Sequence, residues 1–271
     1  MSSRQDIFPD GKGWKRLSYT CRCGWVDWGH AIAGGAYELK RSLELEKMIP
    51  TKSYISYSDL NDRKIEFNNG HEQVPAFIIP FSESMGKLGL TTSYESLWAI
   101  KKGLTTQQRE RVAFSIFVAT SIGFEKMQSS FPFSLTTDSG FSGEDLVSNL
   151  IGFYRAFRLG HTKETDSSGI RRWLGELSEK ESLAIWDKYV APKGGIGAFK
   201  NHTFKPIDFP ATACKGHDCS FPAELQSFQG APYGQWFVRL NNPYPAVANE
   251  LKRDALNVIN RQGNIRTVKK P

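Results

Sequence analysis

The sequence predicts a mostly helical α+β fold in which a small antiparallel sheet follows the first helix and a buried helix lies at the centre. Three observations lead to this expectation. The chain has 271 residues, 39% of them hydrophobic, which is enough to bury a sizeable core. Helical periodicity recurs along the chain and is most strongly apolar in the segment that begins at Thr105. Short runs of β-forming residues, separated by turn sequences, stand between the first two helical segments.

The first helix is expected to follow an irregular N-terminal arm of residues 1–18. Thr20 is a suitable N-cap, apolar positions recur from Trp25 onward, and Pro50 stops the run. The Gly-Gly pair at residues 34–35 weakens this helix near its middle, where it can break in two.

Three segments after this helix are typical of strands, at residues 53–58, 64–68 and 74–81. They are rich in β-forming residues, and turn-forming Asn, Asp and Gly separate them. Pro75 and Pro80 locate the third segment at the edge of the sheet or in a loop, because proline has no N–H to donate to a neighbouring strand.

Two helices are expected next. A short one covers residues 93–103. A longer one is capped by Thr105 or Thr106 and is apolar on most of its faces, which is the pattern of a central, buried helix. Gly123 interrupts this helix near its end.

The rest of the chain begins with a loop or tight hairpin at residues 129–141. The sequence Ser142-Gly-Glu-Asp145 then matches a capping box, and the strongly apolar helix that follows it ends near Gly160. The remaining expectations are helical segments at 169–190 and 249–261, and a long ordered loop region or set of short strands at 192–245.

These elements group into three parts. They are an N-terminal arm (1–18), a helical catalytic core with the small sheet inserted (19–190), and a loop-rich C-terminal region packed on that core (191–271). A lysozyme-like arrangement fits this order, because such hydrolases hold a catalytic glutamate between a helix, a hairpin-like loop and a second helix.

The charge of the chain favours anionic partners. Lysine and arginine number 35 against 28 acidic residues, and a net charge of +7 favours nucleic acid, acidic lipid or bacterial cell wall. The basic residues are scattered and form no recognisable nucleic-acid module, so nucleic acid is not expected as a partner. No stretch is apolar enough to span a membrane. The polar N-terminus, broken by Pro9, does not match a cleavable signal peptide.

Four cysteines form two close pairs, Cys21 with Cys23 and Cys214 with Cys219. Three interpretations stay open. Cys214 and Cys219 can close a small disulfide loop, all four can share one zinc ion with His217 as a spare ligand, or all can be free thiols in a reducing compartment. The single residue between Cys21 and Cys23 counts against zinc, because familiar zinc knuckles have more. No metal and no cofactor is predicted.

Glu125 is the first candidate catalytic residue. It lies near the C-terminal end of the most apolar helix, and Asp138 stands in the turn-rich segment that follows. A carboxylic acid against apolar walls has a raised pKa and can donate a proton, as the general acid of lysozyme-type glycosidases does. The alternative is a surface glutamate paired with Lys126 or a nearby arginine.

A second constellation combines Asp27 and His30 with Cys21. On one helix, residues three apart share a face, so the Asp27 carboxylate can orient the His30 imidazole for base catalysis or metal binding. Cys21, in the first helical turn, can act as a thiolate nucleophile, with His71 as the candidate base of an amidase or peptidase. The alternative is a structural His30 bonded to Asp27, with the tryptophans in the core.

The segments T-C-R-x-G-x-x-D-x-G-H at residues 20–30 and F-S-x-E-D-L-x-S-N-L-x-G at 141–152, together with Glu125, resemble an uncharacterised bacterial family known only as a domain of unknown function. The resemblance spans residues 17–160. In that family a histidine precedes the glutamate, whereas this chain has Phe124, which argues against a metal site that uses both. The resemblance implies a site built from the first helix and the Glu125 helix, and it names no reaction.

Together these observations predict a peptidoglycan-degrading hydrolase, most simply a lysozyme-like, muramidase-type glycosidase. Glu125 is the expected general acid, assisted by Asp138 or a bound water, in a cleft shared with Asp27 and His30. The expected partner is peptidoglycan or another anionic polysaccharide. A basic chain without a signal peptide fits an antibacterial effector, a toxin made in the cytoplasm and exported by a specialised secretion system to the periplasm or cell wall, with an immunity protein as a candidate partner. The alternatives are a cell-wall amidase or peptidase that uses Cys21 or His30, and a non-catalytic binding module.

Overall fold

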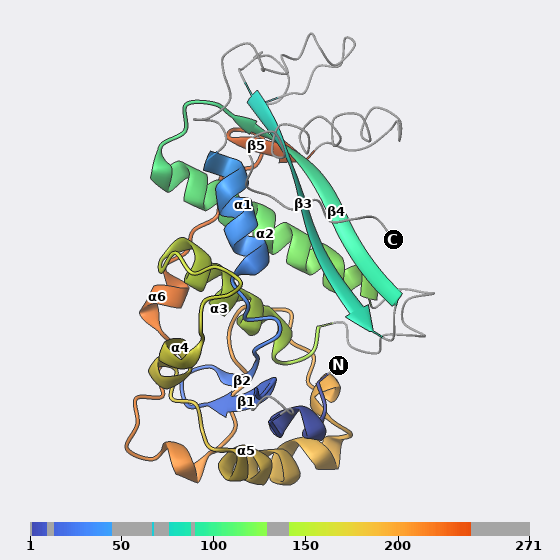
Figure 1. The fold of residues 1–271 in the computed structure, drawn as a ribbon, viewed down its shortest axis with the longest axis vertical. Helices are drawn as coiled ribbons and strands as arrows, with labels where there is room; N and C mark the ends of the chain where they lie inside the picture. The colour runs from blue at the N-terminus through green and yellow to red at the C-terminus, as the bar shows by residue number, and fades with distance from the viewer. Residues whose placement is uncertain are drawn as a thin grey trace. The chain divides into compact units, whose positions relative to one another are not determined.

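Figure 1 shows the fold in a computed structural model, which describes residues 2–9, 14–44, 67, 76–87, 90–128 and 141–239. Helices predominate and two small antiparallel sheets accompany them, so the predicted mostly helical α+β class is confirmed. The chain divides into two compact units. Unit 1 comprises Met1–Tyr37 and Ser121–Phe228, and unit 2 comprises Glu38–Thr120 and Gln229–Pro271. The domain boundaries that the sequence predicts at residues 18 and 190 stay predictions.

A β-hairpin stands where the sequence predicts the start of the first helix. Strands β1 (Leu17–Thr20) and β2 (Gly24–Asp27) pair antiparallel, with Thr20 opposite Gly24. Gly24 has a φ of +62°, in the left-handed region that α-helices of L-residues avoid. The glycine therefore closes a tight turn and begins a strand.

Thr20 supports this turn and does not cap a helix. Its hydroxyl donates to the carbonyl oxygen of Gly24 and accepts from the backbone N–H of Cys23, at 3.1 Å each. The predicted helix from Thr20 is therefore wrong. Within the described residues, helix α1 covers Gly34–Glu44, so the Gly-Gly pair begins the helix and does not break it.

The second sheet belongs to unit 2 and has the strand order β3 (Ala76–Lys87), β4 (Leu90–Lys101), β5 (Phe237–Arg239). The central strand β4 occupies the segment where the sequence predicts a short helix at 93–103, and that prediction is wrong. Ile100 is fully buried between Phe77 of β3 and Phe237 of β5. Pairing on both sides outweighs the weak helical pattern of this segment.

Among the described strands, β3 lies at the edge of this three-stranded sheet, as Pro80 within it predicts. The predicted strand at 53–58 lies outside the described residues. Of the predicted strand at 64–68, the structure describes only Phe67, which is fully buried.

Helix α2 (Thr106–Gln128) confirms the predicted long helix. Thr105 caps it reciprocally: its hydroxyl accepts from the backbone N–H of Gln108 at 3.2 Å, and the Gln108 side chain accepts from the Thr105 N–H at 2.9 Å. The helix continues through Gly123. Its described buried residues are Val112, Ala113, Ile116, Phe117, Thr120, Ser121 and Phe124.

Helix α3 (Asp145–Phe157) is the apolar helix predicted after the Ser142-Gly-Glu-Asp145 sequence. The Asp145 carboxylate accepts from the backbone N–H of Ser142 at 3.0 Å, which is one of the two bonds of the predicted capping box. Nearly every side chain of α3 is buried, and the helix packs against β2 and against α6 (Ala223–Gln226). Its buried Arg155 donates to the carbonyl oxygens of Ala31 and Thr165 at 2.8 Å each.

The predicted helical segment at 169–190 is divided. Helix α4 (Ser168–Trp173) is followed by a turn at Gly175, whose φ is +68°, and then by α5 (Glu179–Ile185), which continues as a π-helical turn over Trp186–Val190. After it the described chain is largely irregular with short 3₁₀ turns, as the Gly, Pro and aromatic content predicts, and only α6 and β5 interrupt it. Among the described residues, no helix has the length and hydropathy that crossing a bilayer requires.

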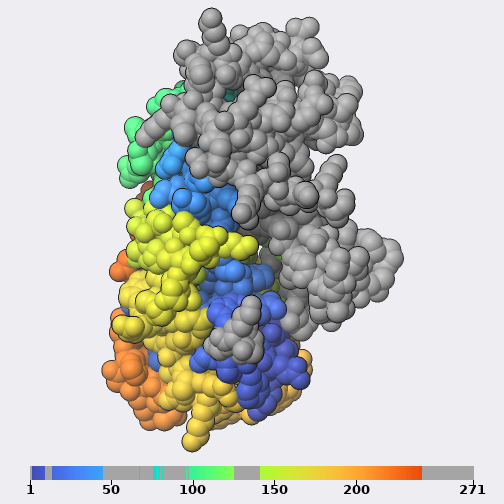
Figure 2. Space-filling view, viewed as in Figure 1, coloured from blue at the N-terminus to red at the C-terminus, as the bar shows by residue number. Residues whose placement is uncertain are grey.

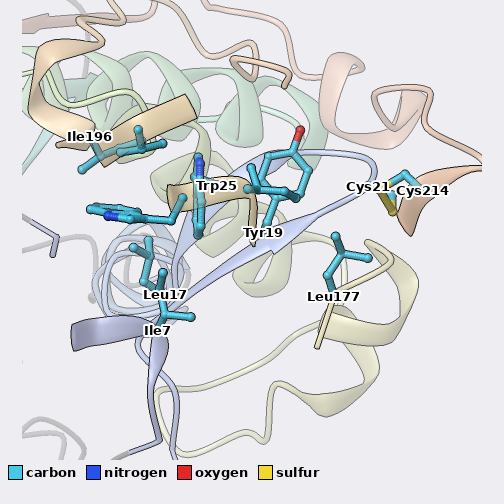
Figure 3. Packing of buried hydrophobic residues seen from close by; sticks show 11 residues of the cluster. Ile7, Leu17, Tyr19, Cys21, Trp25, Leu177, Ile196 and Cys214 are labelled. Carbon is cyan, nitrogen blue, oxygen red and sulfur yellow. A yellow bond between two sulfur atoms is a disulfide. The ribbon is translucent and has the colours of Figure 1, made fainter. Parts of the chain in front are cut away.

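An aromatic cluster that includes side chains of the hairpin forms part of the core of unit 1 (Figure 3). Trp25 meets Tyr19 edge to face at 5.4 Å between ring centroids and Trp186 at 5.5 Å. The other buried members are Ile7, Leu17, Cys21, Leu177, Ile185, Val190, Ile196 and Cys214. Trp25, which the sequence predicts in the first helix, is therefore a core residue of strand β2.

The N-terminal arm contributes to this core. A 3₁₀ turn at Arg4–Ile7 places Ile7 in the aromatic cluster, fully buried. Arg4 makes a two-bond ion pair with Asp187, at 2.7 and 2.9 Å. In the space-filling view the dark blue N-terminal atoms accordingly lie at the surface beside the yellow atoms of the α5 region (Figure 2).

Candidate active site

Strand β2 and the segment that begins α3 meet in unit 1. Strand β2 packs against α3, and the backbone N–H of Asp27 donates to the Ser148 hydroxyl at 2.9 Å. Ser148 in turn donates to the carbonyl oxygen of Glu144 at 2.6 Å. The contact gathers a group of polar side chains, which we call the carboxylate cluster: Arg16, Asp27, His30, Glu144 and Asp145.

Asp27 is the fixed anion of the carboxylate cluster. Its side chain is 1% exposed, and Arg16 approaches it with Nη2 at 2.8 Å and Nε at 3.2 Å. The backbone N–H of Gly29 donates to it at 2.7 Å, and the Ser2 hydroxyl donates at 3.1 Å. Burial by itself raises the pKa of Asp27, but His30, Arg16 and the Gly29 N–H outweigh burial and hold that pKa below its ordinary value.

Glu144 is the opposite case. It is 0% exposed, and neither carboxyl oxygen has a hydrogen-bond partner of ordinary geometry among the described residues. Ser2 lies nearby, but its hydroxyl donates to Asp27. Burial, reinforced by the negative charge of Asp27, raises the pKa of Glu144. Glu144 is therefore held in its neutral, proton-carrying form more strongly than an exposed glutamate.

His30 lies at the accessible edge of the carboxylate cluster, and its side chain is 19% exposed. Its Nδ1 lies 3.9 Å from Oδ1 of Asp145. The expected helical pairing of Asp27 with His30 is wrong, because Asp27 is the last residue of β2 and His30 lies in the turn that follows this strand. There the Asp27 carbonyl oxygen accepts the His30 N–H at 3.0 Å, and the Asp27 carboxylate caps Gly29.

The loop that leads into Glu144 is held in a strained conformation. Phe141 has a φ of +60°, which is unusual for a bulky residue. The buried Asn201 fixes this loop: its N–H donates to the Phe141 carbonyl oxygen at 2.9 Å, and its side-chain amide donates to that of Gly143 at 3.2 Å. The His202 ring lies 4.2 Å from the Phe141 ring. Strain of this kind is found at functional sites more often than elsewhere.

The structure does not describe the carboxyl groups of Glu125 and Asp138, the two residues predicted to catalyse glycoside hydrolysis. The backbone of Glu125 lies in α2, while its side chain and all of Asp138 lie outside the described residues. Their catalytic roles stay predictions. Of the four predicted site residues, the structure brings Asp27 and His30 into one cluster.

Arg16, Glu144 and Asp145 are the members of the carboxylate cluster that were not predicted as site residues from the sequence. In the sequence, Glu144 belongs to the segment predicted to cap a helix. Its carboxyl group becomes buried through the packing of β2 on α3. The available signal is the Glu144-Asp145 pair immediately before an almost wholly apolar helix, because acidic side chains there must be paired, protonated or both.

The cysteines pair differently from every interpretation of the sequence. Cys21 is bonded to Cys214, 193 residues away, and not Cys214 to Cys219. Cys21 lies in the hairpin turn as half of a disulfide, so its predicted role as a helix-borne thiolate nucleophile is wrong. Cys23 is a buried free thiol whose pKa burial raises, and Cys219 is an exposed free thiol. Spacing suggested neighbours in sequence, whereas the fold joins two distant turns.

Comparison of the chain with protein-family models, with curated proteins and with solved structures gave no match. The chemistry of the carboxylate cluster must therefore be argued from its geometry. That geometry provides one carboxyl group with a lowered pKa and one with a raised pKa, beside a partly exposed imidazole.

Proposed function

We propose that the protein is a hydrolase that cleaves glycosidic bonds by general acid catalysis, with Glu144 as the acid. The observation that carries the proposal is the opposite titration of two buried carboxyl groups, the pKa of Asp27 lowered and that of Glu144 raised. A pair of carboxyl groups with diverging pKa values divides naturally into an acid and a charged partner.

In this mechanism the neutral Glu144 donates its proton to the leaving-group oxygen as the glycosidic bond breaks. Asp27 remains ionised, because Arg16, Gly29 and Ser2 all donate to it, and its negative charge stabilises the positive charge that develops on the sugar ring. Water completes the hydrolysis and returns a proton to Glu144. His30, at the accessible edge, is the group suited to relay that proton.

Bacterial peptidoglycan is the substrate that we propose for this reaction. The net charge of +7 supports an anionic polymer as substrate. Export as an antibacterial effector and an immunity protein as partner belong to the same proposal. The assignment of Glu125 and Asp138 as the catalytic pair stays a competing proposal for the same reaction.

Access to the pair is the condition that this proposal must meet. Asp27 is 1% exposed and Glu144 is 0% exposed. Ser2 covers Asp27 from the N-terminal arm, and Arg16, with 34% of its side chain exposed, lies on the solvent side. Substrate binding therefore requires the N-terminal arm near Ser2 to move away from Asp27.

A non-catalytic binding module is the second candidate, and the burial of Asp27 and Glu144 favours it. In such a module the carboxylate cluster is a polar joint between β2 and α3. Buried charged networks of this kind fix the mutual arrangement of two elements without any turnover.

The experiment that separates these candidates is digestion of purified peptidoglycan, with mass spectrometry of the soluble products. Wild type is expected to release disaccharide-peptides, and Glu144→Gln to lose at least about 100-fold in rate, the usual contribution of a general acid. Glu164→Gln, at an exposed glutamate, is the matched control and should retain full activity.

Each other outcome identifies a competing assignment. Full activity of Glu144→Gln together with loss in Glu125→Gln would return the role of acid to Glu125. Release of free stem peptides would indicate an amidase or peptidase. Absence of any product from the folded wild type, with the N-terminal arm intact or with Ser2→Ala, would contradict the hydrolase and support the binding module.

A further inference from the structure

Three sulfur atoms gather at one corner of unit 1. The Sγ atoms of Cys21, Cys214 and Cys219 all lie within 4.8 Å of one another. Cys21 and Cys214 form the disulfide, which is buried at the edge of the aromatic cluster (Figure 3). Cys219 carries the third sulfur as an exposed free thiol. The group therefore holds a disulfide and an attacking thiol side by side.

Arg22 holds the Cys219 thiol in this place. Its Nε donates to the carbonyl oxygen of Ser220 at 3.1 Å, and its Nη2 lies 3.3 Å from the Asp218 carboxylate. These two contacts bracket Cys219 from both sides in the sequence and tie it to the turn that carries Cys21. The Cys219 Sγ itself lies 3.5 Å from the carbonyl oxygen of Cys214.

The loop between Cys214 and Cys219 is already bent for the two residues to approach. The backbone N–H of His217 donates to the Cys214 carbonyl oxygen at 3.1 Å, and Gly216 takes a φ of +86° that a side chain would oppose. A short turn therefore returns the chain towards Cys214.

We propose that Cys219 is a thiol–disulfide exchange site that opens the buried Cys21–Cys214 disulfide. The Cys219 thiolate attacks Sγ of Cys214, the bond between Cys21 and Cys214 breaks, and Cys21 leaves as a thiolate. One sulfur–sulfur bond forms as one breaks, and the proton that Cys219 gives up is taken by Cys21. The step is an isomerisation that consumes no oxidant or reductant.

The exchange moves the disulfide from a buried to an exposed position. A soluble thiol such as glutathione reaches Cys219 at the surface, whereas Cys21 and Cys214 are both buried. Two glutathione molecules then reduce the Cys214–Cys219 disulfide to two thiols and leave as glutathione disulfide. Cys219 is therefore the point at which reducing equivalents enter, and the hairpin turn at Cys21 is released from the 3₁₀ turn at Thr212–Cys214.

Trypsin resolves the pairings, because the four cysteines fall in four different peptides. Cys21 lies in 17–22, Cys23 in 23–40, Cys214 in 201–215 and Cys219 in 216–239. Wild type is incubated at neutral pH, quenched with N-ethylmaleimide, digested without reduction and analysed by mass spectrometry. The proposal expects peptide 201–215 to be linked to 17–22 in one fraction and to 216–239 in another.

The rate of reduction by glutathione provides the second readout. Loss of the link between 17–22 and 201–215 is expected to be at least about tenfold slower in Cys219→Ser, because direct attack on a buried disulfide is hindered. Cys23→Ala, which removes the buried thiol outside the sulfur group, should match wild type. Arg22→Ala keeps all four cysteines but joins 17–22 and 23–40 in one tryptic peptide. In this variant, loss of the link between 17–40 and 201–215 should be slower than in wild type, because Cys219 is released.

Two results would overturn the proposal. One is the absence of any link between 201–215 and 216–239 together with equal reduction rates for wild type and Cys219→Ser. The other is a link between 17–22 and 216–239, which would show that Cys219 attacks the sulfur of Cys21 instead.

Discussion

Asp27 and Glu144 are two buried carboxyl groups of one cluster that titrate in opposite directions. Burial raises the pKa of Asp27, but His30, Arg16 and the Gly29 N–H outweigh burial and hold that pKa below the ordinary value. Glu144 has no such donors of ordinary geometry among the described residues, and its pKa is raised. Each carboxyl group responds to the other, since the charge of Asp27 disfavours ionisation of Glu144. This division of protonation underlies the predictions below.

The free energy of unfolding of the wild type should fall as pH rises above the ordinary pKa of a glutamate, and Glu144→Gln should abolish this fall. Above the ordinary value of 4.5, the unfolded chain ionises Glu144 while the folded protein keeps it neutral, so the free energy of unfolding falls until the folded carboxyl also ionises. Gln is neutral at every pH and close in shape. Urea unfolding between about pH 5 and about pH 8 checks this; a variant that loses stability with pH as steeply as wild type would contradict the raised pKa.

Arg16→Gln should destabilise the fold by about 2 kcal/mol, because it leaves a buried carboxylate with fewer partners. The lowered pKa of Asp27 contributes stability above its ordinary value of 3.8, and this contribution is lost as pH falls through the folded pKa. In the variant the loss should begin at higher pH. Arg4→Gln, which breaks the exposed ion pair with Asp187, is the control and should unfold like wild type. Equal unfolding curves for the two variants would refute the prediction.

Gly24→Ala should lower the free energy of unfolding by roughly 3 kcal/mol, because it combines a left-handed backbone with a steric clash. A Cβ at Gly24 would meet the Ile207 carbonyl oxygen at 2.5 Å. Gly160→Ala is a matched control: its φ of +66° is close to the +62° of Gly24, but nothing lies within 4 Å of its Cβ. The control should cost about 1 kcal/mol from the backbone alone. Thermal and urea unfolding of both variants measure the difference, and similar losses would argue against close packing at Gly24.

The double variant Cys21→Ser/Cys214→Ser should lose about 4 kcal/mol of unfolding free energy, since the disulfide closes a very long loop in the unfolded chain. The two cysteines are 193 residues apart. Cys219→Ser keeps the disulfide and should unfold like wild type under non-reducing conditions. The comparison is made by urea unfolding without reductant. If the double variant kept the wild-type midpoint, the disulfide would not restrain the fold.

Much of the helical framework follows from the sequence. The caps and apolar runs of α2 and α3 are local features: Thr105 pairs with Gln108, and Asp145 accepts the Ser142 N–H, within one turn of chain. Pro80 likewise restricts β3 to a sheet edge by its own chemistry. Such elements are determined by residues a few positions apart, so the sequence alone identifies them.

The hairpin at residues 17–27 and strand β4 were predicted as helices, because the side chains that stabilise them are distant in sequence. Tyr19 is held by its hydroxyl, which donates to the Phe209 carbonyl oxygen at 2.9 Å, and Trp25 by its contact with Trp186. The candidate site has the same origin. Asp27 and Glu144 are each ordinary acidic residues in the sequence, and only the packing of β2 on α3 removes both from water and drives their pKa values apart. The sequence by itself determined the fold class, the long helices and the net charge, while the tertiary structure decided the disulfide and the carboxylate cluster, because burial and pairing depend on contacts that no local pattern encodes.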